Sequence, residues 1–498
     1  MIDPVSNAAL AARYDAIPYA ALPHPLTHPD RLATVATFLG YAPPAPATCR
    51  VLEVGCNDGT NLIPMAVGLP DATFVGCDLS PNAIAAGEAT IAALGLTNIR
   101  LLRQDLATLD PSLGHFDYII AHGVYSWVPA HVRDALFALA GRRLSSGGVM
   151  FVSFNTLPGC HVRQAAWEML HHHVDAIEPP RARLDAARAI ARLIAEGGQP
   201  QHAADEALRA ELRAMAERND SQLMHDDLAQ PNDPFYFRDF VGHAARHGLA
   251  YLAEAELHTM SAAGISPAAR QFLSTLDALG REQYLDFVRL RRFRQSLLRR
   301  AEAPAVAALD PAHIGAMHVS ADGSLLRAAA AGKVADLARD LDAAAGGGGP
   351  ARRLLDALVK QAPAAMPVAQ ARDLLADARE SHARPLETVL RDAYVGGVVN
   401  LHIHPPQVAA VAGERPIASV LARWQARHAE DITTLIHTRV RIPDPNARRL
   451  LTLLDGTRDR AALTAAAAAT WPTGAREQAG AFVAHALEQF ARLALLQG

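Results

Sequence analysis

Three acidic residues, Glu53, Asp78 and Asp105, have types and spacing that fit the recognition of a small ligand. Glu53 begins the pattern Glu-x-Gly-x-x-x-Gly, and each of the three acids closes or follows a short apolar run. Carboxylates accept hydrogen bonds from hydroxyl, amino and ammonium groups. We expect Asp78 to accept both hydroxyls of a ribose. We also expect Asp105 to meet an adenine amino group and Glu53 to hold an ammonium group.

A glycine turn follows Glu53 and predicts close approach of a ligand to the backbone. Gly55, Cys56 and Gly59 shape this turn, and Asn57 stands among them as a residue that tolerates left-handed backbone better than most. Dinucleotide-binding turns follow Gly-x-Gly-x-x-Gly and place a pyrophosphate at a helix N-terminus. Because the carboxylate of Glu53 would repel a pyrophosphate, the pattern favours an amino-acid-like ligand such as S-adenosylmethionine over NAD.

Short apolar runs alternating with helical segments must position these acids. The runs cover residues 51–54, 73–77, 99–102, 116–121 and 149–154. Strands of this kind, separated by roughly 20 to 30 residues that contain a helix, predict βαβ units and a parallel sheet. The first half of the chain is therefore predicted to be an α/β, Rossmann-like, doubly wound domain. Later strands near residues 249–257 and 295–298 are expected to complete the sheet after a helical insertion.

The segment after the fourth predicted strand holds the candidate catalytic residues, His122 and Tyr125. His122 can relay a proton or donate a hydrogen bond to a bound cofactor. Tyr125 and the nearby Trp127 offer electron-rich faces to a sulfonium or an amine. Methyl transfer is an in-line displacement that needs alignment and exclusion of water. The alternative is that all three side chains pack at the end of a strand.

The three acids at successive strand ends together resemble class I S-adenosylmethionine-dependent methyltransferases. The sequences HGVYSWVP (122–129) and SFNTLPG (153–159), and the arm that contains Tyr19 and His28, are similar to bacterial protein-lysine methyltransferases with a C-terminal methyltransferase regulatory domain. Residues 284–295 are similar to the junction of that family. Cys160 stands where the family usually has an aromatic residue.

The resemblance implies a set of site residues around the acids. Leu79 and Leu106, which directly follow Asp78 and Asp105, belong to the predicted cofactor-binding set. The arm around Tyr14, Tyr19 and His28 is expected to close over the cofactor, with Tyr19 in contact with it. Trp127 and Asn155 are the predicted substrate contacts.

The resemblance also implies a two-part enzyme that uses S-adenosylmethionine and releases S-adenosylhomocysteine. A methyltransferase domain is expected over residues 1–305, with an N-terminal arm over 1–45 and a helical insertion at about 165–235. A mostly helical, winged-helix-like regulatory domain is expected over 306–498. The expected reaction is N-methylation of lysine in a protein or peptide partner. A small-molecule or peptide natural-product methyltransferase and a non-catalytic S-adenosylmethionine-binding protein remain alternatives.

Composition excludes several other classes of protein. The 498 residues are 50% hydrophobic with a net charge of −4, which argues against a nucleic-acid partner. The four cysteines form no CxxC pair, and the consecutive histidines 171–173 point in different directions on a helix. His402 and His404 lack a third ligand. We therefore expect no metal site. Without a signal-like N-terminus or a long apolar run, we expect a cytoplasmic chain with no membrane span. The sequence does not indicate an oligomeric state.

Overall fold

The computed structural model describes residues 16–19, 21–303, 311–343, 351–376, 385–469 and 477–498. Tyr14, part of the predicted arm, lies outside the described residues. The predicted boundary between residues 305 and 306 also falls outside them.

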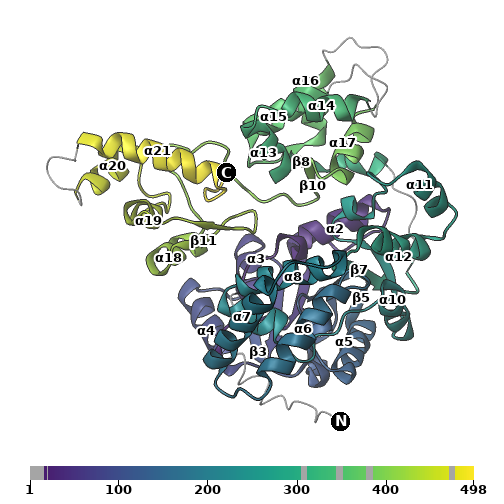
Figure 1. Ribbon diagram of the computed structural model, residues 1–498. Coiled ribbons are helices and arrows are strands. Elements are labelled where there is room, and N and C mark those ends of the chain that lie inside the picture. The colour runs from purple at the N-terminus through teal and green to yellow at the C-terminus, as the bar shows by residue number, and fades with distance from the viewer. Residues whose placement is uncertain (1–15, 20, 304–310, 344–350, 377–384, 470–476) are drawn as a thin grey trace.

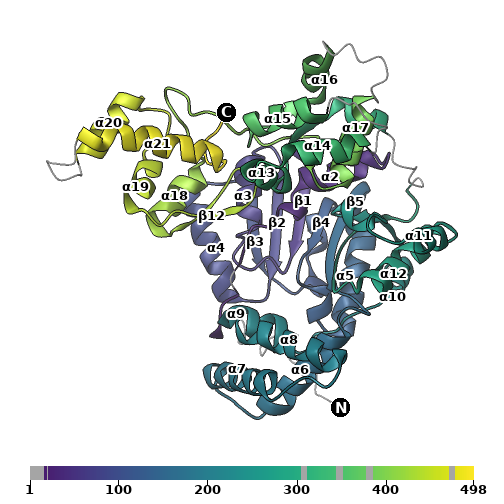
Figure 2. The ribbon, with the colours of Figure 1, turned by 45° about the horizontal axis from the view of Figure 1, so that its top comes forward.

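A seven-stranded sheet forms the centre of the fold (Figures 1 and 2). Its strands are β1 (Arg50–Val54), β2 (Thr73–Asp78), β3 (Ile99–Arg103), β4 (Phe116–Ala121), β5 (Leu144–Asn155), β6 (Leu249–Glu254) and β7 (Phe293–Arg300). Their order is β3-β2-β1-β4-β5-β7-β6, with β1 to β5 parallel and β7 antiparallel to both β5 and β6. The direction of chain crossover reverses between β1 and β4, which is where open α/β sheets bind ligands. The predicted Rossmann-like, doubly wound fold is confirmed.

Helices cover both faces of this sheet, and this explains why its strands are apolar on both sides. Val51 and Leu52, neighbours on β1, are both fully buried but belong to the two different hydrophobic clusters on the opposite faces. One face packs against α2 (Pro29–Phe38), α3 (Leu62–Gly68) and α4 (Pro81–Leu94). The other packs against α5 (Ala130–Arg143) and α10 (Phe237–Arg246).

A group of helices lies between β5 and β6 in the chain and has a hydrophobic core of its own. Leu184, Leu212 and Trp167 are buried in that core. Figure 2 shows this group against one end of the sheet, away from the C-terminal parts of the chain. Its members are α6 (His161–Val174), α7 (Pro180–Glu196), α8 (Ala203–Ala216), α9 (Asp220–Gln222) and the π-helix η6 (Leu223–Asp227).

The chain after β7 forms two further groups of elements. The first joins the core of the sheet through α2, since Phe38 of α2 packs against Tyr394 with ring centroids 5.4 Å apart. It contains the antiparallel strands β8 (His318–Ala321), β9 (Met366–Pro367) and β10 (Val399–His402), with α13 (Gly323–Ala330), α14 (Val334–Ala343), α15 (Ala351–Gln361), α16 (Val368–Ala376) and α17 (Leu386–Val395).

The second group, coloured yellow-green to yellow in Figures 1 and 2, lies beside α3 and α4. It has a separate core that includes Leu451, Leu463 and Leu487. Its elements are α18 (Val420–His428), β11 (Asp431–Thr433), β12 (Arg439–Arg441), α19 (Pro445–Thr452), α20 (Arg460–Ala468) and α21 (Ala479–Arg492). Within the described residues, every helix is too short or too polar to cross a membrane.

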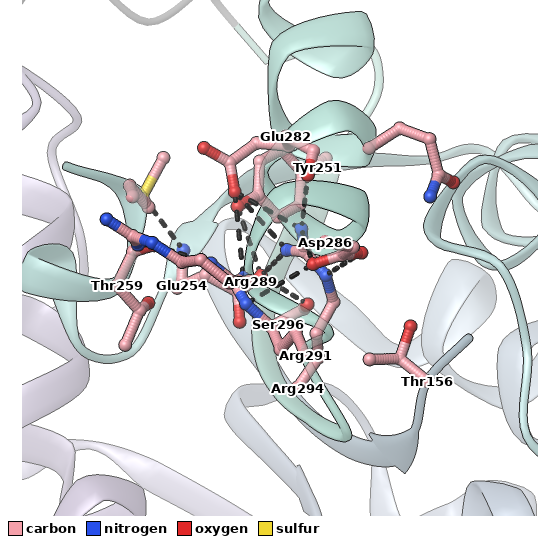
Figure 3. A network of polar contacts seen from close by, with 12 residues as sticks. Thr156, Tyr251, Glu254, Thr259, Glu282, Asp286, Arg289, Arg291, Arg294 and Ser296 are labelled. Carbon is pink, nitrogen blue, oxygen red and sulfur yellow. Dashed lines mark hydrogen bonds and ion pairs between the residues drawn. The ribbon is translucent and has the colours of Figure 1, made fainter. Parts of the chain in front are cut away.

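A buried ionic network holds β6 and β7 to α12 (Ala278–Arg289), which follows α11 (Pro267–Ser274) in the chain (Figure 3). Arg294 on β7 is 1% exposed and lies 2.6 Å from Glu254 on β6. The same guanidinium lies 2.9 Å from Asp286 and 3.3 Å from Glu282, both on α12. Its face also packs 4.0 Å from the centre of the Phe237 ring on α10. One fully desolvated arginine therefore connects two strands and two helices.

Candidate active site

A cavity of about 640 Å³ opens at the carboxyl ends of the parallel strands, where the strand order reverses. Residues at or just after the ends of β1 to β5 line it from one side, and residues of the α6–η6 helix group line it from the other. Of the residues predicted from the sequence, twelve line this cavity: Tyr19, Glu53, Gly55, Cys56, Asn57, Asp78, Leu79, Asp105, Leu106, His122, Trp127 and Asn155.

The loop after β1 has the backbone that its glycines predict. Gly55, Asn57 and Gly59 have positive φ angles of 70°, 50° and 75°. A Cβ atom at Gly55 would lie 3.0 Å from the side chain of Val124, so position 55 has little room for a side chain in addition to its positive φ angle. Gly59 does not line the cavity, and it acts by allowing the turn that leads into α3.

Asp78 and Asp105 stand at the ends of neighbouring strands and are fixed by backbone amides. Asp78 Oδ2 accepts a hydrogen bond of 2.9 Å from the amide of Asn57, and its Oδ1 accepts one of 2.9 Å from the amide of Ser80. Asp105 caps the short helix η3 (Leu106–Thr108) through Ala107. The first interaction ties the glycine loop to the end of β2, so both predicted ribose and adenine contacts sit on rigid elements.

Glu53 is 4% exposed and has one satisfied and one unsatisfied carboxylate oxygen. Its Oε1 accepts a hydrogen bond of 2.7 Å from Asn61 Nδ2. Its Oε2 is buried and has no hydrogen-bond partner among the described residues. Burial is the main cause that raises the pKa of Glu53 to about 8. An ammonium group in the cavity would satisfy this oxygen and favour the ionised carboxylate, so the residue fits the amino-acid end of S-adenosylmethionine.

Asn61 connects Glu53 to the C-terminal part of the chain. Its Oδ1 accepts a hydrogen bond of 2.8 Å from the amide of His24 and lies 2.8 Å from Nε2 of His437. His437 occupies the turn between β11 and β12, is buried, and has a φ of 60°. Such a conformation is uncommon for a residue with a side chain and indicates a constrained position. A residue 376 positions away therefore orients the amide that holds Glu53.

His122 follows β4, lines the cavity, and packs among rings that are tilted against its own. Its ring centroid lies 3.9 Å from that of His24 and 5.8 Å from that of Phe151. Burial lowers the pKa of His122 to about 3, so its imidazole is neutral near pH 7 and a weak proton acceptor. The ring suits contact with a ligand better than general-base catalysis.

Tyr125 does not line the cavity, which differs from the expectation that it faces the reacting methyl group. It is 1% exposed, and its ring packs against Phe137 and Phe240 with centroids 5.2 Å away in each case. Its hydroxyl lies 2.8 Å from Nδ1 of His243, on the α5–α10 side of the sheet. The apolar faces of those helices draw the ring into the core, so Tyr125 has a packing role.

The two predicted substrate contacts both lie in the cavity wall. Trp127 ends the short helix η5 (Tyr125–Trp127), and its buried indole nitrogen has no partner among the described residues. Asn155 ends β5, and its side-chain amide donates a hydrogen bond of 2.8 Å to Asn232. Both therefore place polar groups beside the end of β4.

The described part of the N-terminal arm reaches the cavity at Tyr19. The backbone oxygen of Tyr19 accepts a hydrogen bond of 3.4 Å from Asn57 in the glycine loop. Its ring meets that of His225 edge to face, with centroids 5.6 Å apart. His28 lies deeper, where it caps α2 and faces the ring of His437. The arm thus joins the first strand loop to the helix group on the far wall.

That far wall was not predicted from the sequence to carry site residues. The cavity is lined here from α6, the turn after α8 and η6, by Arg163, Arg218, His225 and Asp226. Burial raises the pKa of Asp226 to about 6, and the neighbouring Asp227 acts in the same direction. The local sequence there shows only helical periodicity, so no motif marks these residues.

Arg163 and Arg218 both pair with the fully buried carboxylate of Asp227. Arg163 lies 3.0 Å and Arg218 2.6 Å from its two oxygens. The indole of Trp167 donates a further hydrogen bond of 2.9 Å to the same group. The single carboxylate of Asp227 thereby balances one of these two positive charges within the wall.

Three family models match parts of the chain. The model described as "Methyltransferase domain" matches residues 52–150, and the one described as "Predicted methyltransferase regulatory domain" matches 219–300. The model described as "PKMT, C-terminal winged helix domain" matches 414–475. The regulatory match precedes residue 306, where the resemblance placed the start of that domain, and it covers β6 and β7.

Curated relatives share substantial identity with parts of the chain. An uncharacterized protein of Rickettsia prowazekii (strain Madrid E) is 38% identical over 289 residues, which is 57% of this chain and 52% of that protein. A second from the same organism is 32% identical over 236 residues, 47% of this chain and 94% of that protein. A trans-aconitate 2-methyltransferase of Methylobacterium nodulans is 29% identical over 123 residues, 25% of this chain and 44% of that protein. The match thus spans about half the length of the first relative.

Among solved structures, PKMT2 from Rickettsia typhi is similar over nearly the whole chain. The TM-score is 0.81 at 25% identity, with 96% of this chain and 100% of that chain covered. The same protein in complex with AdoHcy matches with a TM-score of 0.80 at 24% identity, covering 97% of this chain and 100% of that one.

Proposed function

We propose that this chain, which belongs to the S-adenosylmethionine-dependent methyltransferases, methylates the side-chain nitrogen of lysine residues in a protein partner. The observation that carries the lysine assignment is the likeness to PKMT2, whose abbreviation denotes a protein-lysine methyltransferase, over 96% of this chain. That likeness extends well beyond the sheet common to methyltransferases. It includes the stretch 414–475, which matches the winged-helix model named for PKMT.

We assign the cofactor contacts to the residues that close the strand ends. When bound, S-adenosylmethionine supplies an electrophilic methyl group on a sulfonium. Glu53 Oε2 binds the ammonium group, Asp78 binds the ribose hydroxyls, and Asp105 meets the adenine amine. The positive φ angles of Gly55 and Gly59 keep the loop close to the ligand. These residues bind and align, and the chemical step needs little else than a deprotonated amine in line with the methyl group.

The acceptor side lies between the end of β4 and η6. His122, Trp127 and Asn155 form one wall, and Asp226 stands on the helical wall of the same cavity. With a pKa of about 6, Asp226 is mostly ionised above neutral pH and is the carboxylate that we assign to hold the lysine ammonium before it loses its proton. Orientation of the amine and exclusion of water are the contributions of this wall.

A carboxylate acceptor, the substrate type named in the trans-aconitate relatives, is less well supported by this wall. The two cavity arginines, Arg163 and Arg218, are already paired with Asp227. An anionic substrate would have to approach these guanidinium groups beside the carboxylates of Asp226 and Asp227.

We also propose that the chain has two parts with different roles. The sheet and the helix group α6–η6 form the methyltransferase domain up to about residue 305. The remainder, 306–498, forms the C-terminal part that shapes the site through His437.

Incubation of the full chain with isotope-labelled S-adenosylmethionine and a bacterial cell extract tests the proposal, with the label located by peptide mass spectrometry. Label on lysine nitrogen that disappears with Glu53→Gln supports it. Label on a carboxylate or a small molecule would refute the lysine assignment. Cofactor binding without any transfer would instead indicate a sensor. Because the chain contains only Lys333 and Lys360, self-methylation is easily separated from substrate labelling.

A further inference from the structure

A carboxylate and two imidazoles meet on the outer side of the sheet, where α5 packs against α10. Asp134 lies on α5, His243 lies on α10, and His247 follows one turn later at the end of that helix. His247 Nε2 is 2.9 Å and His243 Nε2 is 3.4 Å from the same oxygen, Oδ1 of Asp134. One potential ligand atom from each residue lies within 4.8 Å of the others. Among the described residues, this is the group of three that comes together in such a way.

The orientation of His243 is fixed by a contact on its other ring nitrogen. The hydroxyl of Tyr125 lies 2.8 Å from His243 Nδ1, and Phe137 packs edge to face with centroids 4.8 Å apart. If Nε2 binds a metal ion, the ring proton resides on Nδ1 and donates to the phenol oxygen. Metal-binding histidines usually make an outer hydrogen bond of this kind. Burial lowers the pKa of His243, which favours the neutral ring that coordination requires.

We propose that Asp134, His243 and His247 bind a divalent transition metal ion of the zinc type. Two imidazole nitrogens and one carboxylate oxygen suit zinc, cobalt or nickel better than magnesium or calcium. The ligand atoms of a tetrahedral zinc ion stand about 3.3 Å apart, because each bond is about 2.0 Å long. The distances of 2.9 and 3.4 Å around Asp134 lie on either side of that value. Water completes the fourth position.

The site is open to solvent and separate from the cofactor cavity. The side chain of Asp134 is 60% exposed, whereas those of His243 and His247 are 12% and 17% exposed, so an ion can enter from outside and meet two ordered rings. None of the three residues lines the cavity. The ion would join α5 to α10, and α10 belongs to the stretch matched by the regulatory-domain model. The sequence alone predicted no metal site because Asp134 and His243 are 109 positions apart.

Cobalt chloride titrated into the full-length, tag-free protein tests the proposal by calorimetry and visible absorption. We expect one Co²⁺ per chain, with the intense visible bands of a tetrahedral ion, and displacement of Co²⁺ by Zn²⁺. Asp134→Asn and His247→Ala should each weaken binding at least tenfold, while His172→Ala, which removes an exposed histidine on α6, should leave it unchanged.

Two results would overturn the proposal. One is the absence of stoichiometric Co²⁺ binding to the unmodified protein. The other is equal binding by the unmodified protein and both ligand variants. Replacement of His243 is avoided because it also removes the partner of the buried Tyr125. Circular dichroism of Asp134→Asn and His247→Ala verifies that each variant is folded, so that lost binding reports on the ligands alone.

Discussion

The affinity of the protein for its cofactor should rise with pH because of Glu53. In the free protein, the pKa of this buried carboxyl is raised to about 8, and its Oε2 lacks a partner. Binding of an ammonium group favours the ionised carboxylate. Below pH 8, cofactor binding must therefore displace a proton from Glu53, and each pH unit of decrease costs affinity.

The expected size of the effect follows from the ionised fraction. With a pKa of about 8, roughly 1% of Glu53 is ionised at pH 6 and roughly 9% at pH 7. The dissociation constant of S-adenosylhomocysteine, which carries the same ammonium group, should then fall about tenfold over this interval, equivalent to about 1.4 kcal/mol. The ligand's ammonium group stays charged throughout this range, so its own titration does not contribute to the pH dependence of the dissociation constant.

Isothermal titration calorimetry at pH 6, 6.5 and 7 measures this dependence. Repeating the titrations in buffers of different ionisation enthalpy counts the protons released, and close to one proton per ligand is expected at pH 6. Glu53→Gln, which keeps the size of the side chain, should bind at least tenfold more weakly at pH 8. Its affinity should no longer change between pH 6 and 7.

Asp226 is the necessary control because it lines the same cavity and has a pKa of about 6. Asp226→Asn should retain the pH dependence of cofactor binding. His122 and His24, with pKa values lowered by burial to about 3 and about 4, do not titrate in this interval. A change of less than twofold in the unmodified protein, or a slope that persists in Glu53→Gln, would refute the assignment of Glu53 to the ammonium group.

Substitutions in the acceptor wall, at the C-terminal contact and in the buried ionic network should have separate effects. Asp226→Asn should lower kcat/KM for the labelled acceptor at least tenfold. The Kd of the cofactor, measured by calorimetry, should stay within twofold of the unmodified value. An equal loss of kcat/KM and of cofactor affinity would contradict the place of Asp226 on the acceptor side. His437→Ala removes one hydrogen-bond partner of Asn61 Oδ1, which keeps the amide of His24, so the net loss is about 1–1.4 kcal/mol. Cofactor binding weakened about five- to tenfold is expected by calorimetry, and unaltered affinity would show that Asn61 holds Glu53 without it. Arg294→Met leaves the buried carboxylate of Glu254 without an ion pair, whereas Asp286 keeps its pair with Arg291. The change should cost about 3–5 kcal/mol, seen as a lower thermal unfolding midpoint by circular dichroism; an unchanged midpoint would contradict the network.

The cofactor side of the site could be predicted because its information is local in the sequence. Glu53, Asp78 and Asp105 each stand at the end of a strand, and parallel strands that are neighbours bring their carboxyl ends to one edge. The glycine pattern likewise predicts the positive φ angles of its own loop. Right-handed connections between the predicted parallel strands then leave few possible strand orders.

The rest of the site depends on contacts that no local pattern encodes. His437 reaches Asn61 from a turn that is 376 positions away, and Asp226 reaches the cavity because a helix group folds over the strand ends. Tyr125 is the opposite case, because its local position after β4 predicts a site residue but its side chain does not reach the cavity. Its ring turns instead into the apolar space between the sheet and α10, where burial of an aromatic group is favourable.

The stretch 219–300, although it matches a regulatory-domain model, is part of the central sheet. It supplies β6 and β7, and β7 pairs along β5, the strand that ends at Asn155 in the cavity wall. Arg294 fastens these strands to α12 with its charge fully buried (Figure 3). Because all of its members lie within 219–300, this network holds the segment together internally. What holds the segment to the rest of the sheet is the β5–β7 ladder, from the pair Met150 and Leu298 to the pair Asn155 and Phe293, and detachment would break those backbone hydrogen bonds and expose the buried Leu298. Any regulation that this stretch provides must therefore act through small shifts of β5 and its neighbours, rather than through release of a separate domain.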